Sequence, residues 1–109
     1  MKRNEVTAKA LVEMGYKAMV RYQSWYRNEL RECNEKQSRE LMELVAKTAR
    51  NGGKVTFVRN DYTYVVNAYV DCANNCHGNT YFISRPMTET EKFEADVRTR
   101  RGIEWDWAN

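Results

Sequence analysis

Residues 6–33 read VTAKALVEMGYKAMVRYQSWYRNELREC, and the order of apolar and charged side chains in this stretch decides the fold that the sequence predicts. When successive residues are placed at about 100° around an axis, most apolar and aromatic side chains fall on one side and most charged ones on the other. The pattern predicts one long helix that runs through Gly15. A glycine inside a helix costs about 1 kcal/mol relative to alanine, so its place on the apolar side indicates close packing there.

A second helix is predicted over residues 35–50. Asn34 precedes it as a candidate N-cap, with Gln37 three residues later in a capping-box arrangement. Asn51-Gly52-Gly53 follows, and glycine readily adopts the left-handed conformation that ends a helix. We therefore expect a helical hairpin made of 6–33 and 35–50.

The composition changes at Lys54 to β-branched and aromatic residues, which predicts strands over 55–59, 62–70 and 80–84. Asn60-Asp61 suits a two-residue turn between the first two strands and would pair Phe57 with Tyr64. In that register the strands present a single core face, formed by Val55, Phe57, Tyr62, Tyr64, Val66, Ala68 and Val70.

After a loop over 71–79 and the third strand, Thr88 and Glu91 form a capping-box pattern that opens a short helix to about Arg101. Gly102 is expected to end this helix. The alternating residues 103–107 then predict a short strand or a docking tail. The fold class is therefore α+β, in the order α-α-β-β-β-α with or without a terminal strand. We expect one domain, 1–109, in which a three- or four-stranded antiparallel sheet packs on the long helical hairpin.

Composition limits the classes of function. Apolar residues make up 42% and charged residues 30% of the 109 residues, as in a globular domain. No apolar run approaches the roughly 20 residues of a membrane-spanning helix, and the charged start Met1-Lys2-Arg3-Asn4-Glu5 does not resemble a signal peptide. The three cysteines, an odd number, fit a reducing compartment better than a secreted disulfide framework. We therefore expect a cytoplasmic protein with no membrane partner.

The loop DCANNCHGN, residues 71–79, is the segment richest in chemically reactive groups. Thiolates and imidazoles bind zinc, but a structural site needs four ligands in a suitable spacing. Cys72, Cys76 and His77 are therefore only weak candidates for metal or thiol chemistry. No spacing indicates a catalytic set or a cofactor, and we expect a protein that is not an enzyme.

The aromatic side chains favour a protein-binding module. A helix over 6–33 would be about 40 Å long, and the small sheet would not cover all of its apolar side. Interfaces favour Tyr, Trp, Met and Arg, so the uncovered part predicts a protein partner or a second copy of the chain in a homodimer. The candidate interface residues are Tyr22, Trp25, Tyr26, Tyr62 and Tyr69.

Such a module would act as an inhibitor or adaptor by occupying its partner's surface. In compactness, aromatic content and absence of enzyme motifs the chain resembles small phage-encoded accessory proteins that block host machinery. That likeness is of general character, rests on no motif and assigns no residue.

The alternative function is nucleic-acid binding, because basic side chains gather on the polar side of the first predicted helix and again near residue 100. The net charge of +3 is too small to identify a nucleic-acid-binding protein by itself. Phosphate contacts nevertheless need such clusters. The candidates are Lys17, Arg21, Arg27, Arg31, Arg98, Arg100 and Arg101.

Overall fold

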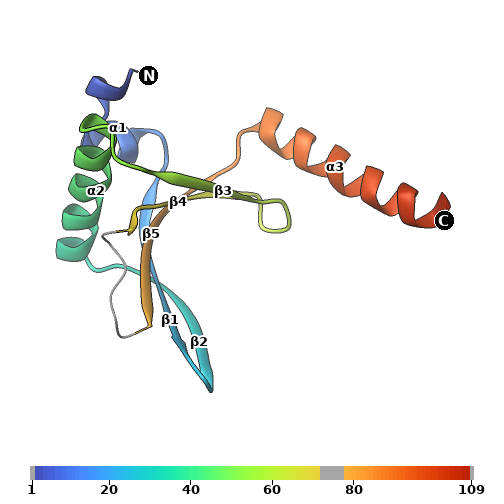
Figure 1. Ribbon diagram of the computed structural model, residues 1–109, viewed down its shortest axis with the longest axis horizontal. Coiled ribbons are helices and arrows are strands. Elements are labelled where there is room, and N and C mark those ends of the chain that lie inside the picture. Colours follow the sequence, from blue (N-terminus) through green and yellow to red (C-terminus); the bar gives the residue numbers. More distant parts are fainter. Residues whose placement is uncertain (1, 72–77, 109) are drawn as a thin grey trace.

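The computed structural model describes residues 2–71 and 78–108, and the side chains among them as far as residue 98. It is an α+β fold with a five-stranded antiparallel sheet in the order β2-β1-β5-β4-β3. Figure 1 shows the helices at opposite ends of this sheet. The elements along the chain are η1 (Arg3–Glu5), α1 (Ala8–Glu13), β1 (Lys17–Ser24), β2 (Arg27–Glu32), α2 (Glu35–Arg50), β3 (Thr56–Asn60), β4 (Val65–Tyr69), β5 (Asn79–Pro86) and α3 (Glu89–Ala108).

The prediction of one long helix over 6–33 is wrong. The helical part ends at Glu13, and Gly15 adopts φ +97°, a left-handed conformation that redirects the chain into β1. From there the residues alternate in the manner of a strand, with Ala18 and Val20 buried and Lys17 exposed. Residues 17–32 form a β-hairpin, so the expected order α-α-β-β-β-α is replaced by α-β-β-α-β-β-β-α.

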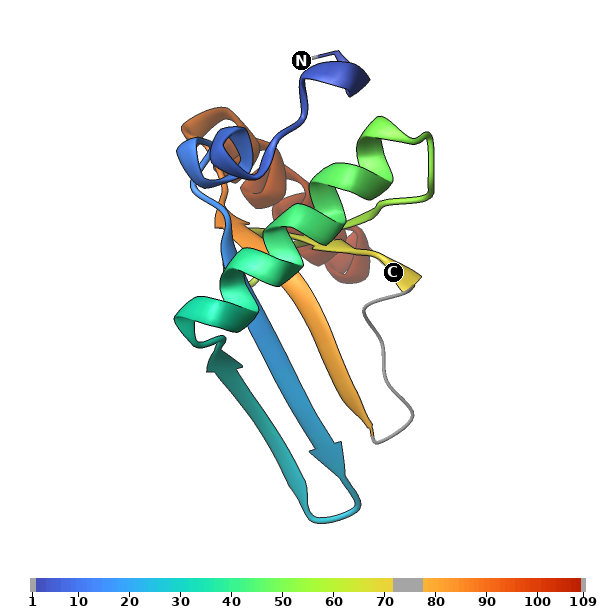
Figure 2. The same cartoon turned by 90° about the vertical axis from the view of Figure 1, so that its left-hand side faces the viewer.

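The second helix is confirmed with its predicted bounds, as α2. The Asn34 side chain accepts a hydrogen bond from the Gln37 amide at 2.8 Å, and the Gln37 side chain accepts one from the Asn34 amide at 3.3 Å. The apolar face of α2 lies on the sheet (Figure 2), with Leu41, Met42, Val45 and Ala46 buried. Gly52 follows the helix with φ +76°.

The strands predicted over 55–59 and 62–70 are present as β3 and the shorter β4, but the predicted register is wrong. Phe57 pairs with Ala68, not with Tyr64, because residues 61–64 form a longer turn. The predicted core face holds only in part as a result. Val66, Ala68 and Val70 are buried, whereas Phe57 and Tyr62 are exposed.

The third predicted strand is confirmed and extended as β5, which lies in the centre of the sheet between β1 and β4. Ile83, opposite both Ala18 and Ala68, is fully buried beneath α2. On the opposite face, Tyr69 stacks on Phe82 with ring centroids 5.0 Å apart. The central strand therefore carries core residues on both faces.

The helix after β5 begins as predicted but does not end at Gly102. Thr88 and Glu91 form the expected capping box. The helix then continues to Ala108, so the terminal strand predicted over 103–107 is wrong. Its first half packs on β4 through Ala95, beside Val66 and Met87. Its second half extends away from the sheet (Figure 1).

No helix in the described part of the chain is long and apolar enough to cross a lipid bilayer.

Candidate interaction surface

The β1–β2 hairpin, residues 17–32, forms an arm that extends beyond the rest of the sheet (Figures 1 and 2). Near its base, Ala18 and Val20 are buried under α2, whereas most residues toward the turn are exposed. Since β1 pairs with β5 only as far as Tyr22, the last part of the arm is a two-stranded ribbon. We call residues 17–32 the hairpin arm.

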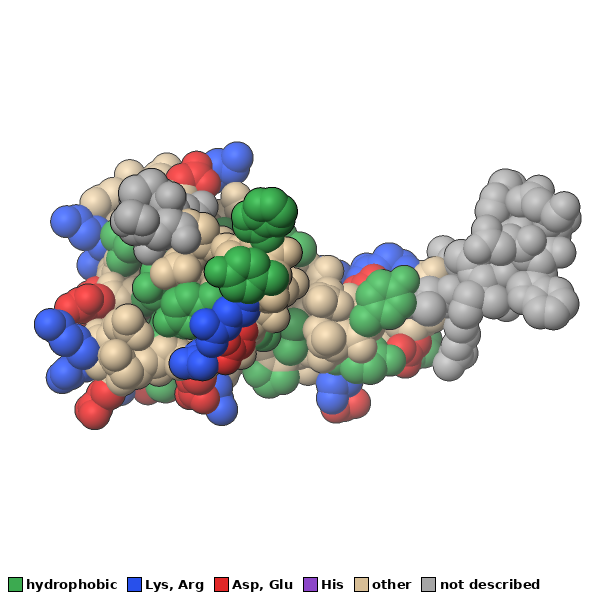
Figure 3. All heavy atoms as spheres, turned by 90° about the horizontal axis from the view of Figure 1, so that it is seen from below, with side chains coloured by type: hydrophobic (Ala, Val, Ile, Leu, Met, Phe, Trp, Pro, Cys, Tyr) green, Lys and Arg blue, Asp and Glu red, His purple; other side chains and the backbone are tan. Residues whose placement is uncertain are grey.

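Trp25 and Tyr26 form the turn of the hairpin arm and are 96% and 91% exposed. Burying an aromatic side chain of this size is worth roughly 2–3 kcal/mol, and the fold obtains none of that from either residue. Figure 3, which views the molecule from the end of the arm, shows large hydrophobic side chains standing out beside basic ones. We call Trp25 and Tyr26 the aromatic tip.

Behind the tip, three charged residues of β2 form one connected row on one face of the arm. The Glu29 carboxylate accepts hydrogen bonds from Arg27 Nε at 2.8 Å and from Arg31 Nε at 2.5 Å. Arg31 and then Arg27 hold the pKa of Glu29 below its usual range, while Glu29 raises the pKa of Arg31. The Arg31 guanidinium also lies 5.9 Å from the centre of the Tyr22 ring. The row presents planar, partly paired charges close to the tip.

The structure brings together only some of the aromatic interface candidates. Trp25 and Tyr26 share the tip, and Tyr22 lies below them, half buried against the core. Tyr62 is 90% exposed but lies in the β3–β4 turn, at another end of the sheet. Tyr69 is half buried against Phe82. One candidate surface therefore consists of the tip and the arm behind it, and Tyr62 lies outside it.

The basic candidates also divide between two places. Lys17, Arg21, Arg27 and Arg31 all lie on the hairpin arm, on strands and not on the helix that the sequence predicted. Arg98 lies on α3, where its guanidinium holds the Asp61 carboxylate by hydrogen bonds of 3.1 and 2.7 Å. Arg100 and Arg101 lie where side chains are not described. The tip and the basic candidates of residues 17–31 therefore belong to the same element.

The weak metal candidates Cys72, Cys76 and His77 lie outside the described residues. Within the described ones, no three His, Cys, Asp or Glu side chains are grouped as metal ligands would be. Cys33 is free and buried at the base of the arm, and burial raises the pKa of its thiol. A high thiol pKa and poor access make Cys33 a packing residue of the core.

Several exposed apolar residues were not singled out by the sequence. Leu30 is 50% exposed on β2, and Phe57 is 62% exposed on β3. The sequence predicts Phe57 on the buried face of the sheet, so its exposure differs from the prediction. Leu30 could have been found from the alternation of residues 27–32, which places it between charged neighbours in a strand.

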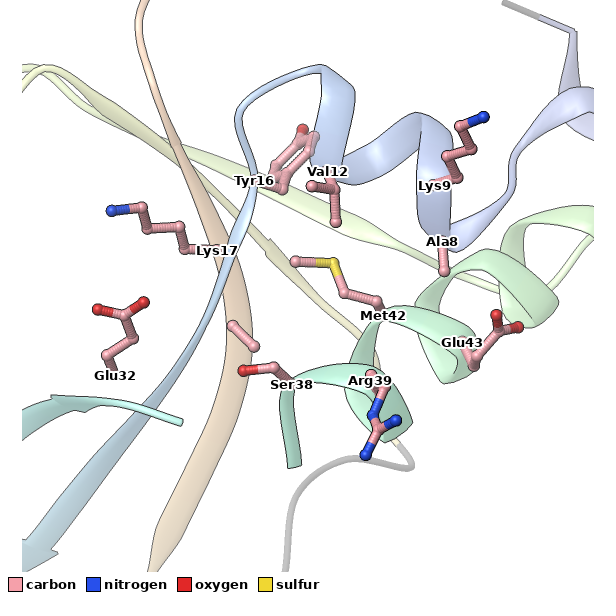
Figure 4. A pocket seen from close by; sticks show the side chains of 11 residues that line it. Ala8, Lys9, Val12, Tyr16, Lys17, Glu32, Ser38, Arg39, Met42 and Glu43 are labelled. Atoms are coloured by element: carbon pink, nitrogen blue, oxygen red, sulfur yellow. The ribbon is translucent and has the colours of Figure 1, made fainter. Parts of the chain in front are cut away.

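A pocket of about 420 Å³ opens between α1, the start of β1 and the first half of α2. Figure 4 shows Met42 in its centre, with Lys17 and Glu32 at one margin and Lys9 and Glu43 at the other. The lining combines an apolar floor with a rim of both charges. Because Glu32 belongs to β2, the pocket adjoins the base of the hairpin arm.

Comparison of the chain with protein-family models, with curated proteins and with solved structures finds no match.

Proposed function

We propose that this protein is a non-enzymatic protein-binding module that docks onto a partner through the aromatic tip and the hairpin arm, as an inhibitor or adaptor does. The observation that carries the proposal is the near-complete exposure of two adjacent aromatic residues at the end of an ordered hairpin. Tryptophan and tyrosine dominate the binding energy of protein interfaces when a partner buries them.

The charges around the tip support a protein partner. Glu29 forms ion pairs with Arg27 and Arg31 of the arm, which reduces the positive charge available to phosphates. Arginine and aromatic side chains are enriched in protein interfaces, whose rim is polar. Asp61 forms an ion pair with Arg98 of α3 in the same way.

The test compares the protein with a Trp25→Ala/Tyr26→Ala variant in capture experiments from native lysate, with and without nuclease. We expect a nuclease-resistant protein partner whose affinity falls at least tenfold in the variant, because truncating a central interface aromatic costs roughly 2 kcal/mol or more. The free energy of unfolding should change by less than about 0.5 kcal/mol, since neither side chain packs in the fold.

Tyr62→Ala is the matched control, because Tyr62 is as exposed as the tip but lies in another turn. Its partner binding should equal that of the unmodified protein. Equal capture by the tip variant and the unmodified protein would overturn the proposal.

Nucleic-acid binding by the same arm is the second candidate, because Lys17, Arg21, Arg27 and Arg31 share it with two aromatic side chains that bases could stack on. It predicts an affinity for oligonucleotides that falls steeply with salt, with a slope reduced by about one unit in Arg21→Ala. An absence of any mobility shift at low salt would exclude this candidate.

A further inference from the structure

β2 is an edge strand of the sheet, and its outer side lies at the margin of the molecule (teal in Figure 2). An edge strand presents unpaired backbone N–H and C=O groups, which proteins either protect or use for pairing. The residues of β2 are Arg27, Asn28, Glu29, Leu30, Arg31 and Glu32, all exposed except the half-buried Glu29.

The hydrogen bonds to β1 determine which backbone groups of β2 point outward. The Cys33 amide donates to the Ala18 carbonyl at 3.0 Å, and the same register pairs Val20 with Arg31 and Tyr22 with Glu29. In an antiparallel ladder every second residue bonds to a given neighbour. Residues 29 and 31 therefore bond to β1, whereas Asn28, Leu30 and Glu32 direct their backbone groups away from the sheet.

We propose that β2 pairs antiparallel with β2 of a second copy of this chain, with Leu30 opposite Leu30 of the second copy, to form a continuous ten-stranded sheet. In this register the outward residues meet one another, Asn28 opposite Glu32 of the second copy and the reverse. Every pair of outward backbone groups can then form the ladder bonds of an antiparallel sheet.

The side chains select the same register. Glu29 lies opposite Arg31 of the second copy, and Arg31 opposite its Glu29, so two opposite-charge pairs form on one face. On the other face, Leu30, which is 50% exposed in the single chain, meets its counterpart at the two-fold axis. An isologous interface requires such self-complementarity.

Other registers fail for stated reasons. Moving the second copy by one residue places outward groups opposite inward ones and removes the hydrogen bonds. Moving it by two residues places Glu29 opposite Glu29, or Arg31 opposite Arg31, and like charges directly opposite are unfavourable. The charges of β2 thus disfavour the antiparallel registers that neighbour the proposed one. β3, at the other edge, has the sequence TFVRN and lacks an alternation of sign that would select a register.

The proposal is separate from the binding role of the aromatic tip. Trp25 and Tyr26 lie outside the paired residues 28–32, so the tip variant should still dimerise. Sedimentation velocity of the whole chain measures its oligomeric state. Concentrations of roughly 10 μM to 1 mM suit weak self-association. We expect a reversible dimer, and a monomer throughout this range would overturn the proposal.

Leu30→Pro tests the edge directly. The Leu30 amide points outward and bonds to nothing within the chain's own sheet, and proline is tolerated at such edge positions. We expect the far-ultraviolet circular dichroism spectrum to be retained and the dissociation constant of the dimer to rise at least tenfold. Unchanged dimerisation by the proline variant would show that another surface pairs the chains.

Exchanging the charges of Glu29 and Arg31 tests the proposed register independently of any effect on folding. Glu29→Arg and Arg31→Glu should each weaken the homodimer, since each places like charges opposite one another twice. A mixture of the two variants restores both opposite-charge pairs and should form a heterodimer. Dimerisation of each single variant as strongly as the mixture would overturn the proposed register.

Discussion

Gly15 lies at the point where helix changes to strand, with a φ of +97° that other residues adopt only with strain. A Cβ at this position would lie 3.6 Å from Pro86 Cδ, an ordinary contact, so the penalty for a side chain comes from the backbone alone. We expect Gly15→Ala to lower the free energy of unfolding by about 1–2 kcal/mol. Urea denaturation measures the change.

Gly15→Asn is the matched control, because asparagine tolerates the left-handed conformation better than alanine. The asparagine variant should lose less stability than the alanine variant. An alanine variant as stable as the unmodified protein would contradict the account of this junction.

The residues around Gly15 show why the first element was predicted wrongly. The apolar side chains of 6–33 satisfy a helical period when counted together, but from Tyr16 onward they also alternate, and Val20 lies on the polar side of the predicted helix. Tertiary contacts decide between two such periods, because Ala18 and Val20 become buried only when β1 pairs with β5 and lies under α2. The aromatic tip could be named from the sequence, but its exposure at a turn could not.

Among the elements, α3 is held to the sheet by a small set of ionic contacts around Glu91. Val66 on β4 lies directly opposite Arg59 on β3 and Arg85 on β5, so one arginine lies on each side of it. Arg85 Nη1 lies 2.7 Å from Glu91 Oε1, and Arg59 Nη2 lies 2.9 Å from Glu94 Oε2. Tyr64 also donates a hydrogen bond to Asp96. The first half of α3 therefore depends on carboxylates being ionised.

The pKa of the Glu91 carboxyl determines how this stabilisation changes with pH. The Arg85 guanidinium and the Thr88 amide lower the pKa of Glu91 from 4.5 to about 2. Because the folded-state pKa lies below the unfolded one, the stabilisation is present above about pH 4.5 and is lost as the pH falls toward 2. We expect Glu91→Gln to lower the free energy of unfolding by about 1–2 kcal/mol at pH 7 and by much less at pH 2, measured by urea denaturation.

Glu89→Gln is the control for Glu91→Gln. Glu89 is 93% exposed, and among the described side chains it pairs with Lys92 at 3.4 Å, an exposed pair of a kind that contributes little. Its substitution should leave the free energy of unfolding within about 0.5 kcal/mol of the starting value at both pH values. A loss in the Glu91 variant that is the same at pH 7 and pH 2 would contradict the assigned role.

The sequence predicted elements best where local groups determine them. Asn34 with Gln37 and Thr88 with Glu91 form capping boxes in the structure as their spacing predicted. The prediction of a two-residue β3–β4 turn is wrong, because the Asn60 side chain accepts hydrogen bonds from the amides of residues 62 and 63. Tyr64 then adopts φ +54°. These contacts lengthen the turn and shift the register, and no spacing rule for a two-residue turn anticipates them.

The molecule as a whole is more extended than its length requires. Its radius of gyration is 16.0 Å, whereas a compact chain of this size has one of about 13 Å. The difference reflects the hairpin arm and α3, which both extend from the sheet (Figure 1). A chain that places an edge strand on such an extension leaves that edge accessible along its full length.

Pairing through β2 makes the stability of the whole molecule depend on its concentration, because a dimer of folded chains shifts the unfolding equilibrium by mass action. Above the dissociation constant, each tenfold rise in concentration should raise Tm by about 3 °C for a chain of this size. The Tm of Leu30→Pro should rise less over the same range, because its dissociation constant is higher. Differential scanning calorimetry at several concentrations gives both slopes, and equal slopes for the two proteins would show that β2 does not join the chains.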